Sequence, residues 1–168
     1  MDFKEKEIKD LSENPFKLIG DDWMLITAGK SDDFNTMTAS WGNLGILWHK
    51  PVATCFIRPQ RHTFDYANNA PYFTLSFFDE KYRKILNFCG SRSGRDTDKV
   101  KETGLNPVFI EDNIIGFEQA RMVIVCKKLY EGDLQPGNFL FQELIDKNYK
   151  KNDFHRFYIG EIVKYLEK

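Results

Sequence analysis

Three short segments of the chain carry side chains that could bind a polar heterocycle or an anion. The first is the run Asn35, Thr36, Met37, Thr38, Ala39, Ser40 and Trp41, in which hydroxyl side chains alternate with other residues. The backbone of an extended chain, with short hydroxyls, can pair with donors and acceptors along a planar heterocycle, while Met37 or Trp41 covers its face. The alternative is a solvent-facing strand in which threonine serves β propensity, and composition alone favours that alternative.

The second segment is Arg58-Pro59-Gln60-Arg61-His62-Thr63, at a predicted junction between a strand and a helix. Backbone N–H groups at the start of a helix attract anions, and the side chains of Arg61, His62 and Thr63 add directional donors. These features predict a phosphate site. An exposed basic turn, with Thr63 as a plain helix cap, explains the same residues equally well.

The third segment runs from Ser91 to Lys99 and combines hydroxyls and three cations with Gly94, just before a predicted helix. Such a segment could bind a second phosphate or act as a movable lid, although a solvated charged loop is the commoner outcome. The chain contains neither the GxxxxGK[ST] nor the GxGxxG pattern, so neither nucleotide-binding fingerprint is present.

Histidine and cysteine spacing gives no support to hydrolytic or metal chemistry. His49, His62 and His155 are far apart, and no Ser-His-Asp or Cys-His arrangement follows from their spacing. The three cysteines form no CxxC pair, which argues against a zinc site and against a disulfide framework. Reduced thiols fit a cytoplasmic protein.

The elements that must position these segments are mostly strands. Apolar and alternating runs predict strands near residues 23–28, 34–41, 46–48, 52–57, 72–78, 108–110, 114–117, 120–130 and 154–165. Short helices are expected over 63–69, over 80–89 with Asp79 as cap, and after a cap at Asp96. This order favours a mainly β fold, a closed antiparallel barrel with short helical insertions. Residues 1–15 are expected to form an arm or short helix that Pro15 stops, and residues 16–168 a single domain.

Composition narrows the classes of protein further. The 168 residues include 15 Phe, 7 Tyr and 3 Trp, more rings than a small barrel can enclose, so some should cover a ligand or a partner subunit. A formal net charge of -1 lacks the basic footprint of a nucleic-acid binder. The longest nearly apolar stretch is too short to cross a bilayer, and the charged N-terminus does not resemble a secretion signal.

Taken in chain order, these segments resemble the flavin reductase-like, FMN-binding split-barrel family, in particular its flavoredoxin-type members. The resemblance extends over about residues 16–165. It rests on five runs together: Asn35 to Trp41, Ile57 to Thr63, Ser76-Phe77-Phe78, Ser93 to Lys99 and His155 to Ile162. No single run is diagnostic, but the five in this order are fairly specific.

The resemblance implies a homodimeric, six-stranded split barrel that holds FMN non-covalently near the subunit interface. It implies that residues Asn35 to Trp41 bind and flank the isoalloxazine ring, that Arg61, His62 and Thr63 bind the phosphate and ribityl chain, that Ser76 and Phe77 form a further wall, that Lys99 is an additional phosphate partner, and that His155 lies at the nicotinamide approach. Relatives often carry Gly-Asp before that histidine. Here Asp153 and Phe154 precede His155, which weakens the inference of NAD(P)H-dependent reduction more than that of flavin binding.

The predicted function is therefore that of a cytoplasmic FMN-binding oxidoreductase. It would be either an NAD(P)H-dependent flavin reductase or a flavoredoxin-like electron transfer protein with a redox partner protein. Neither a metal nor an acid-base dyad is needed, because the flavin carries the redox chemistry. The alternative is a non-catalytic β-barrel binding module that uses aromatic rings and Arg58, Arg61, Arg92 and Arg95 on single-stranded nucleic acid. The near-neutral net charge counts against that alternative.

Overall fold

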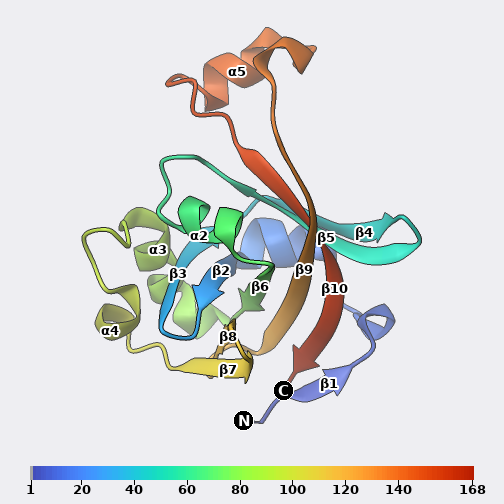
Figure 1. The fold of residues 1–168 in the computed structure, drawn as a ribbon, viewed down its shortest axis with the longest axis vertical. Coiled ribbons are helices and arrows are strands. Elements are labelled where there is room, and N and C mark those ends of the chain that lie inside the picture. The colour runs from blue at the N-terminus through green and yellow to red at the C-terminus, as the bar shows by residue number, and fades with distance from the viewer. Residues whose placement is uncertain (1) are drawn as a thin grey trace.

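One large antiparallel sheet dominates the computed structural model, which describes residues 2–168 (Figure 1). The strand order is β3-β2-β6-β9-β10-β5-β4, and β1 pairs with β10. Two further strands, β7 and β8, form a separate pair. The bounds are β1 (Lys4–Lys6), β2 (Met24–Lys30), β3 (Asp33–Ala39), β4 (Gly42–Leu47), β5 (Lys50–Ile57), β6 (Tyr72–Phe77), β7 (Pro107–Glu111), β8 (Ile114–Phe117), β9 (Met122–Asp133) and β10 (Arg156–Glu167).

The two ends of this strand order lie close together in space. β3 and β4 are at opposite ends of the order, yet β3 ends at Ala39 and β4 begins at Gly42. Three steps of about 3.8 Å between Cα atoms cannot span more than about 11 Å. The sheet must therefore curl until its ends approach each other, which confirms the predicted mainly β, barrel-type fold.

The first half of β9 is buried on both faces of the sheet. Met122, Ile124 and Cys126 pack in an inner cluster enclosed by the curled sheet. Val123 and Val125 belong to a second cluster that includes Leu86 and Cys89 of α3. Alternate residues of a strand point to opposite faces. The first half of β9 is therefore a continuous apolar run. It faces the barrel interior on one side and the inserted helices on the other.

The helices are short and connect the strands. No helix among residues 2–168 is long and apolar enough to cross a membrane. Their bounds are α1 (Pro15–Lys17), α2 (Thr63–Asn69), α3 (Arg83–Ser91), α4 (Lys99–Thr103) and α5 (Gln142–Asn148), with 3₁₀ turns η1 (Ile8–Asp10), η3 (Glu80–Tyr82) and η4 (Pro136–Asn138) and a π-helical turn η2 (Leu18–Asp22).

One predicted helix start was right in position but lacks the expected cap, and a second was wrong. Asp79 makes no side-chain capping hydrogen bond, and a 3₁₀ turn precedes α3, which begins at Arg83. Asp98 rather than Asp96 caps α4, because its side chain accepts the backbone N–H of Lys101. Asp96 and Asp98 both have side chains that can cap a helix, so the sequence alone did not show which of them does so.

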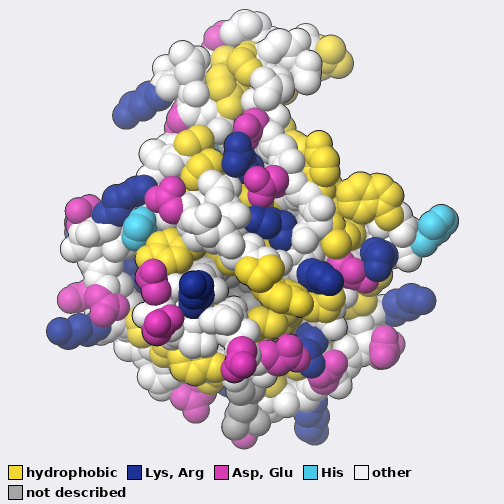
Figure 2. All heavy atoms as spheres, viewed as in Figure 1, with side chains coloured by type: hydrophobic (Ala, Val, Ile, Leu, Met, Phe, Trp, Pro, Cys, Tyr) yellow, Lys and Arg dark blue, Asp and Glu magenta, His cyan; other side chains and the backbone are white. Residues whose placement is uncertain are grey.

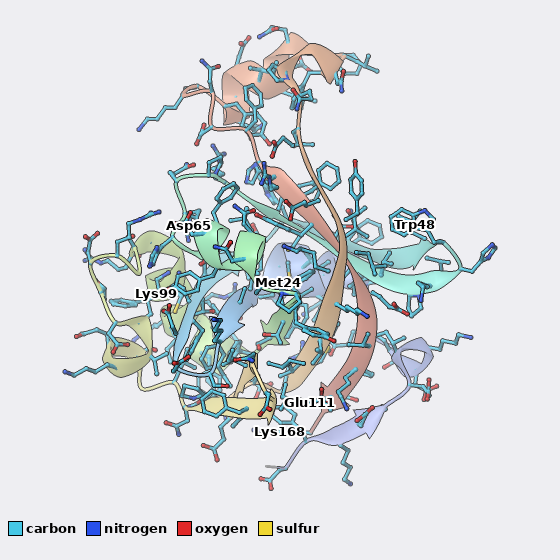
Figure 3. The ribbon with its side chains drawn as sticks, in the orientation of Figure 1. Met24, Trp48, Asp65, Lys99, Glu111 and Lys168 are labelled. Atoms are coloured by element: carbon cyan, nitrogen blue, oxygen red, sulfur yellow. The ribbon has the colours of Figure 1, made fainter. Side chains whose placement is uncertain are left out.

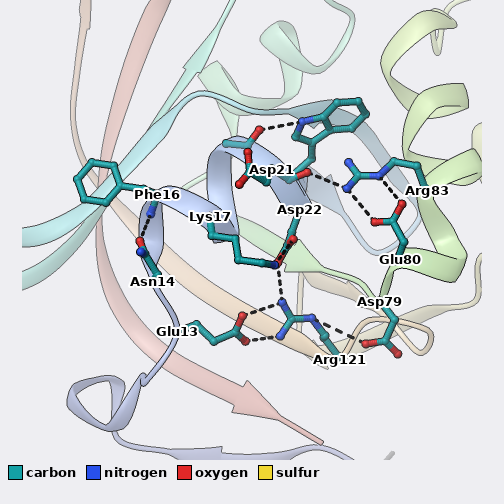
Figure 4. Close-up of polar contacts among 12 residues, drawn as sticks. Glu13, Asn14, Phe16, Lys17, Asp21, Asp22, Asp79, Glu80, Arg83 and Arg121 are labelled. Atoms are coloured by element: carbon teal, nitrogen blue, oxygen red, sulfur yellow. Dashed lines mark hydrogen bonds and ion pairs between the residues drawn. The ribbon is translucent and has the colours of Figure 1, made fainter.

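The N-terminal residues extend the sheet instead of forming a helix. β1 pairs with the end of β10, with Lys4 opposite Glu167. Pro15 starts α1 rather than stopping a helix, as proline favours the first helical position. Figure 4 shows Arg121 joining the segment to the sheet through Glu13 and, at 3.3 Å, Asp22. The segment thus combines the short strand β1 with the 3₁₀ turn η1.

The far ends of β9 and β10 project beyond the rest of the sheet and carry α5 (Figure 1). We call residues 134–155, which connect these strands, the α5 arm. Three of its side chains, Leu140, Phe141 and Leu144, are exposed apolar groups. His155 lies at its C-terminal end, next to β10, so the arm sets the position of that histidine.

Candidate functional site

β3 carries the hydroxyl-rich run and is the end strand of the described sheet. Met37 and Ala39 pack in the inner cluster. The hydroxyl of Thr36 pairs with that of Thr27 on β2 at 2.9 Å, and the hydroxyl of Thr38 donates to the carbonyl of Leu86. The alternative prediction, a strand that faces solvent, is therefore wrong. Because the protein already uses these two hydroxyls, the outer backbone edge of β3 is the part left for a ligand.

The start of β3 and the basic turn meet in one place. The amide of Asn35 donates to the hydroxyl of Thr63 at 2.8 Å, and both side chains are buried. Asn35 and Thr36 share a cavity of about 630 Å³ with His62 and Lys99. We call this the cation cavity. The two segments that sequence analysis singled out first are thus brought together by tertiary contacts.

Two neighbouring cations, Lys99 in the lining of the cation cavity and Arg61 beside it, have no carboxylate partner in residues 2–168. The Lys99 ammonium donates to the carbonyls of Thr36 at 2.7 Å and Cys89 at 2.9 Å. The Arg61 guanidinium donates to the carbonyls of Gly90 at 2.7 Å and Cys89 at 3.5 Å. Both side chains therefore donate to the carbonyl of Cys89. Lys99 is labelled in Figure 3.

Burial lowers the pKa of both members of this pair. Burial, with a smaller contribution from the Arg61 charge, lowers the pKa of Lys99 to about 8. Burial also lowers the pKa of Arg61. Buried charges are ordinarily paired with an opposite charge. The aspartates that line the cavity, Asp32, Asp33, Asp96 and Asp98, form no ion pair with either cation among the described residues. An anion that contacts both cations would supply the missing counter-charge.

The glycine-containing loop between α3 and α4 lies directly against β3. A Cβ atom at Gly94 would lie 2.2 Å from Oδ1 of Asn35, so only glycine fits the observed approach. Arg95 fastens the loop to the α2 region, because it donates to the carbonyl of Gln60 at 3.0 Å and to the carboxylate of Asp65 at 3.0 Å. The third sequence segment therefore forms a wall of the cation cavity.

The end of the hydroxyl-rich run lines a different cavity. Ser40 and Trp41 border a space of about 440 Å³ together with Phe16 and Phe56. We call it the aromatic cavity. The run from Asn35 to Trp41 therefore spans from the cation cavity at its start to the aromatic cavity at its end, and its middle residues are internal.

His155 lies beside the aromatic cavity. Its ring centroid is 5.0 Å from that of Trp41, and its Nδ1 is 2.9 Å from the hydroxyl of Tyr149. Burial, followed by the nearby charge of Arg58, lowers the pKa of His155 to about 4. The ring is therefore neutral at neutral pH. Sequence reasoning missed Tyr149, because a lone tyrosine in a polar connection carries no pattern that points to a histidine.

Three predicted site residues have other surroundings. Ser76 and Phe77 are fully buried on β6 and line neither the cation cavity nor the aromatic cavity. His62 lies at the edge of the cation cavity, with its ring 5.1 Å from that of Tyr66 and its Nδ1 buried without a hydrogen-bond partner among the described residues. The roles implied for Ser76, Phe77 and His62 remain predictions.

The arginines that would serve a nucleic-acid surface are partly engaged within the protein. Arg58 pairs with Asp153 at 2.6 Å, and Arg95 pairs with Asp65 at 3.0 Å. Arg61 donates to the carbonyls described above. The two ion pairs engage Arg58 and Arg95, which a nucleic-acid surface would need free, and they weaken the nucleic-acid alternative.

A row of aromatic rings crosses the sheet beside the α5 arm. Consecutive ring centroids are 5.0–6.4 Å apart. Figure 2 shows hydrophobic side chains gathered between the arm and the β4–β5 hairpin. We call this row the aromatic stripe; in order it comprises Tyr130, Phe157, Phe56, His155 and Trp41.

A comparison of the chain with protein-family models finds one family that matches most of it. The family model described as flavin reductase like domain matches residues 18–168. None of the curated proteins compared with the chain matches it in sequence. The match begins where η2 begins, so it includes every element that lines the cation cavity and leaves out β1, η1 and α1.

Solved structures of low sequence identity share the fold. An FMN-binding domain of a flavin reductases-like enzyme from Shewanella baltica has a TM-score of 0.69 at 15% identity over 98% of this chain and 76% of its own. Flavoredoxin of Desulfovibrio vulgaris has a TM-score of 0.67 at 18% identity over 98% and 77%. Nitrilotriacetate monooxygenase component B from Bacillus cereus has a TM-score of 0.66 at 14% identity over 95% and 80%. The fold is that of FMN-binding split-barrel domains.

Proposed function

Because the chain belongs to the flavin reductase-like domain family, we propose that it binds FMN non-covalently and acts as an oxidoreductase. It works either as an NAD(P)H-dependent flavin reductase or as a flavoredoxin-like electron carrier for a redox partner protein. The observation that carries this proposal is the pair of cations, Arg61 and Lys99, which converge on the carbonyl of Cys89 without a carboxylate partner among the described residues.

The cation cavity fits the phosphate end of FMN. A terminal phosphate carries a negative charge and several acceptor oxygens, and Arg and Lys supply charge-assisted donors for it. Both side chains now donate to neutral carbonyls, which a phosphate oxygen can replace as the stronger acceptor. Asn35 and Thr63 hold each other by hydrogen bond at the same cavity, so they fix the spacing of β3 from the basic turn.

The outer edge of β3 fits the polar edge of the flavin ring. The carbonyl of Thr36 accepts from Lys99. The other backbone N–H and C=O groups of this edge face no neighbouring strand in the described sheet, so they can pair with ring donors and acceptors. Ser40 and Trp41, at the aromatic cavity, would flank the far end of the ring. FMN, when bound, supplies the hydride and single-electron chemistry, and the protein supplies orientation and electrostatics.

His155 would act where a nicotinamide approaches the ring. Its ring lies beside Trp41 and is neutral above a pKa of about 4, so at neutral pH it offers one N–H donor and one acceptor. A neutral donor can orient a nicotinamide without adding a positive charge that would compete with the cation cavity for anions.

We further propose a homodimer in which the aromatic stripe is covered by the second subunit. Tyr130 and Trp41 are 52% and 45% exposed, and exposed apolar patches of connected rings mark interaction surfaces. A cytoplasmic location fits the three cysteines, Cys55, Cys89 and Cys126, which are free thiols.

Visible absorption of the purified protein, before and after addition of FMN and then of NADH or NADPH without oxygen, tests the proposed function. Bleaching of a bound flavin by the nicotinamide supports the reductase. A protein that stays yellow with NAD(P)H, but is bleached by a strong chemical reductant, supports the electron carrier. A colourless protein that cannot take up FMN contradicts both.

The role of His155 is separable from flavin binding. We expect His155→Ala to slow reduction by NAD(P)H more than it weakens FMN binding, since the histidine lies at the ring end and not at the cation cavity. Stopped-flow reduction and an FMN titration measure the two effects, with His49→Ala, in the exposed β4–β5 turn, as the control. A larger loss of FMN affinity than of reduction rate would place His155 at the cofactor instead.

A further inference from the structure

Tyr149 and His155 form a buried hydrogen-bonded pair at the base of the α5 arm. The hydroxyl of Tyr149 is 2.9 Å from Nδ1 of His155, and both residues are buried. Among residues 2–168, this nitrogen is the one hydrogen-bond partner of the Tyr149 hydroxyl. A buried hydroxyl proton needs an acceptor.

The direction of this hydrogen bond follows from what each atom can do. If Nδ1 carried the proton and donated to the tyrosine oxygen, the phenol proton would be left in the interior with no acceptor among the described residues. If the phenol donates to Nδ1, both atoms are satisfied. In a neutral imidazole, one nitrogen accepts and the other carries the proton, so the proton is on Nε2.

Nε2 of His155 is the free end of the pair. It makes no hydrogen bond within residues 2–168. The only buried side-chain N and O atoms without a partner in this part of the chain are His62 Nδ1 and Ser76 Oγ, so Nε2 of His155 is not fully buried. Nε2 therefore keeps some contact with solvent, and the centroid of the ring that carries it lies 5.0 Å from that of Trp41, which lines the aromatic cavity. A donor at this position is available to a ligand in or beside the aromatic cavity.

Several contacts hold Tyr149 in place. Its ring stacks on Phe154 with centroids 4.7 Å apart and lies 5.1 Å from the Arg58 guanidinium. Arg58 is itself fixed by Asp153 at 2.6 Å and by the carbonyl of Asn148 at 2.9 Å. The phenol has little freedom to turn away, so its hydrogen bond to the imidazole is preorganised by the C-terminal part of the α5 arm and by Arg58.

We propose that Tyr149 is a positioning residue that holds His155 as the neutral tautomer with its proton on Nε2, where that N–H is directed at the substrate of the reductase reaction. This inference rests on the proposed function for its catalytic consequence, but the tautomer itself is a property of the protein without flavin. Donors that are fixed before the reaction stabilise developing charge with no reorganisation at the moment of reaction.

The tautomer is tested by ¹⁵N NMR of the histidine ring nitrogens in flavin-free protein at pH 7, with His155 assigned from a His155→Gln spectrum. We expect a protonated Nε2 and an unprotonated Nδ1. In Tyr149→Phe, which keeps the stacked ring and removes only the hydroxyl, both nitrogens should move towards averaged shifts. Tyr158→Phe is the matched control, because Tyr158 is equally buried and its hydroxyl donates to Asn68 at 2.6 Å.

The catalytic consequence is tested by stopped-flow reduction of the FMN-loaded protein. Tyr149→Phe should slow reduction by about tenfold with unchanged FMN affinity, a fraction of the roughly 10²- to 10³-fold that one preorganised donor contributes. A protonated Nδ1 in the wild-type spectrum, or a Tyr149→Phe variant with wild-type shifts, overturns the tautomer assignment even if no flavin binds. Correct shifts with a wild-type reduction rate overturn the positioning role.

Discussion

At the scale of single residues, the positive charge of the cation cavity is the property with the clearest consequences. Arg61 and Lys99 are close enough to share one carbonyl acceptor, and neither has a carboxylate partner within residues 2–168. In the unliganded protein this arrangement costs stability, since both charges lose water without gaining a counter-ion. We infer that the cost is retained because an anion binds there.

Removal of Arg61 should weaken FMN binding selectively. A hydrogen bond to a charged group contributes about 1.5–3 kcal/mol, so Arg61→Ala should raise the dissociation constant of FMN by roughly 10- to 100-fold. Quenching of flavin fluorescence measures this constant. Arg83→Ala is the control, because Arg83 pairs with Glu80 and packs over Trp23, away from the cation cavity (Figure 4). Equal affinities in wild type and Arg61→Ala would refute the phosphate assignment.

FMN affinity should also depend on the ionisation of Lys99. Its pKa of about 8, below the usual 10.5, means that the free protein loses this positive charge as pH rises above about 8. The dissociation constant of FMN should therefore increase between pH 7 and pH 9.5. Riboflavin, which has the same ring and no phosphate, serves as the matched ligand, and its affinity should stay nearly constant over this range. Parallel curves for FMN and riboflavin would show that Lys99 does not face the phosphate.

The same pKa shift has a defined effect on folding. Between pH 8 and 10.5 the unfolded chain holds a proton on Lys99 that the folded chain has released. The free energy of unfolding contributed by this group therefore rises with pH across that window. Deprotonation of Lys99 therefore raises the free energy of unfolding and lowers the affinity for a phosphate.

At the scale of elements, the loop between α3 and α4 fixes the start of β3. Gly94 approaches the Asn35 amide so closely that any side chain would displace it, and that amide also holds Thr63. The loop, the edge strand and the basic turn are thus linked through Asn35. Each element alone has an ordinary conformation, and the cavity exists because they meet.

Gly94→Ala should disturb this junction. The added methyl group forces the Asn35 amide away from Thr63, and overpacking of this kind costs about 1–3 kcal/mol of unfolding free energy. Urea unfolding and an FMN titration should both show a loss. Gly45→Ala is the control, because nothing lies within 4 Å of a Cβ at Gly45 and this residue lines neither the cation cavity nor the aromatic cavity. If Gly94→Ala binds FMN as wild type does, the loop is not a wall of the site.

At the scale of the whole molecule, the aromatic stripe explains where the surplus of rings is placed. The inner cluster contains only part of them. The stripe carries others, of which Tyr130 and Trp41 are exposed, and Figure 2 shows hydrophobic side chains gathered between the α5 arm and the β4–β5 hairpin. A second subunit that covers the stripe would also cover the aromatic cavity beside it, because Trp41 and Phe56 belong to both.

Dimerisation should depend on the stripe. We expect light scattering after size exclusion to give a dimer at micromolar concentration, and Tyr130→Asp to shift it to the monomer while circular dichroism stays unchanged. Phe109→Asp is matched to it, since Phe109 is 49% exposed against 52% for Tyr130 but lies on β7, in the separate strand pair. A wild-type monomer, or a Tyr130→Asp dimer, would show that the stripe is not the interface.

The sequence alone determined the features that depend on local patterns. Alternation along residues 34–41 identified β3 and its two faces, and the long apolar run at 120–130 identified the strand that the structure shows as β9. Glycine at position 104 marked the end of α4, where its φ of 69° is left-handed. Such signals are readable because side-chain periodicity and turn chemistry act over a few residues.

Only the tertiary structure decided which distant groups meet. Strand pairing placed β1 beside β10, and the curl of the sheet brought Asn35 to Thr63 and Arg61 to Lys99. Likewise, the fold of the α5 arm put Tyr149 against His155. These contacts depend on register, closure and packing of the whole chain, and no local pattern encodes them. The residue types for the chemistry were visible in the sequence, whereas their combination into two cavities was not.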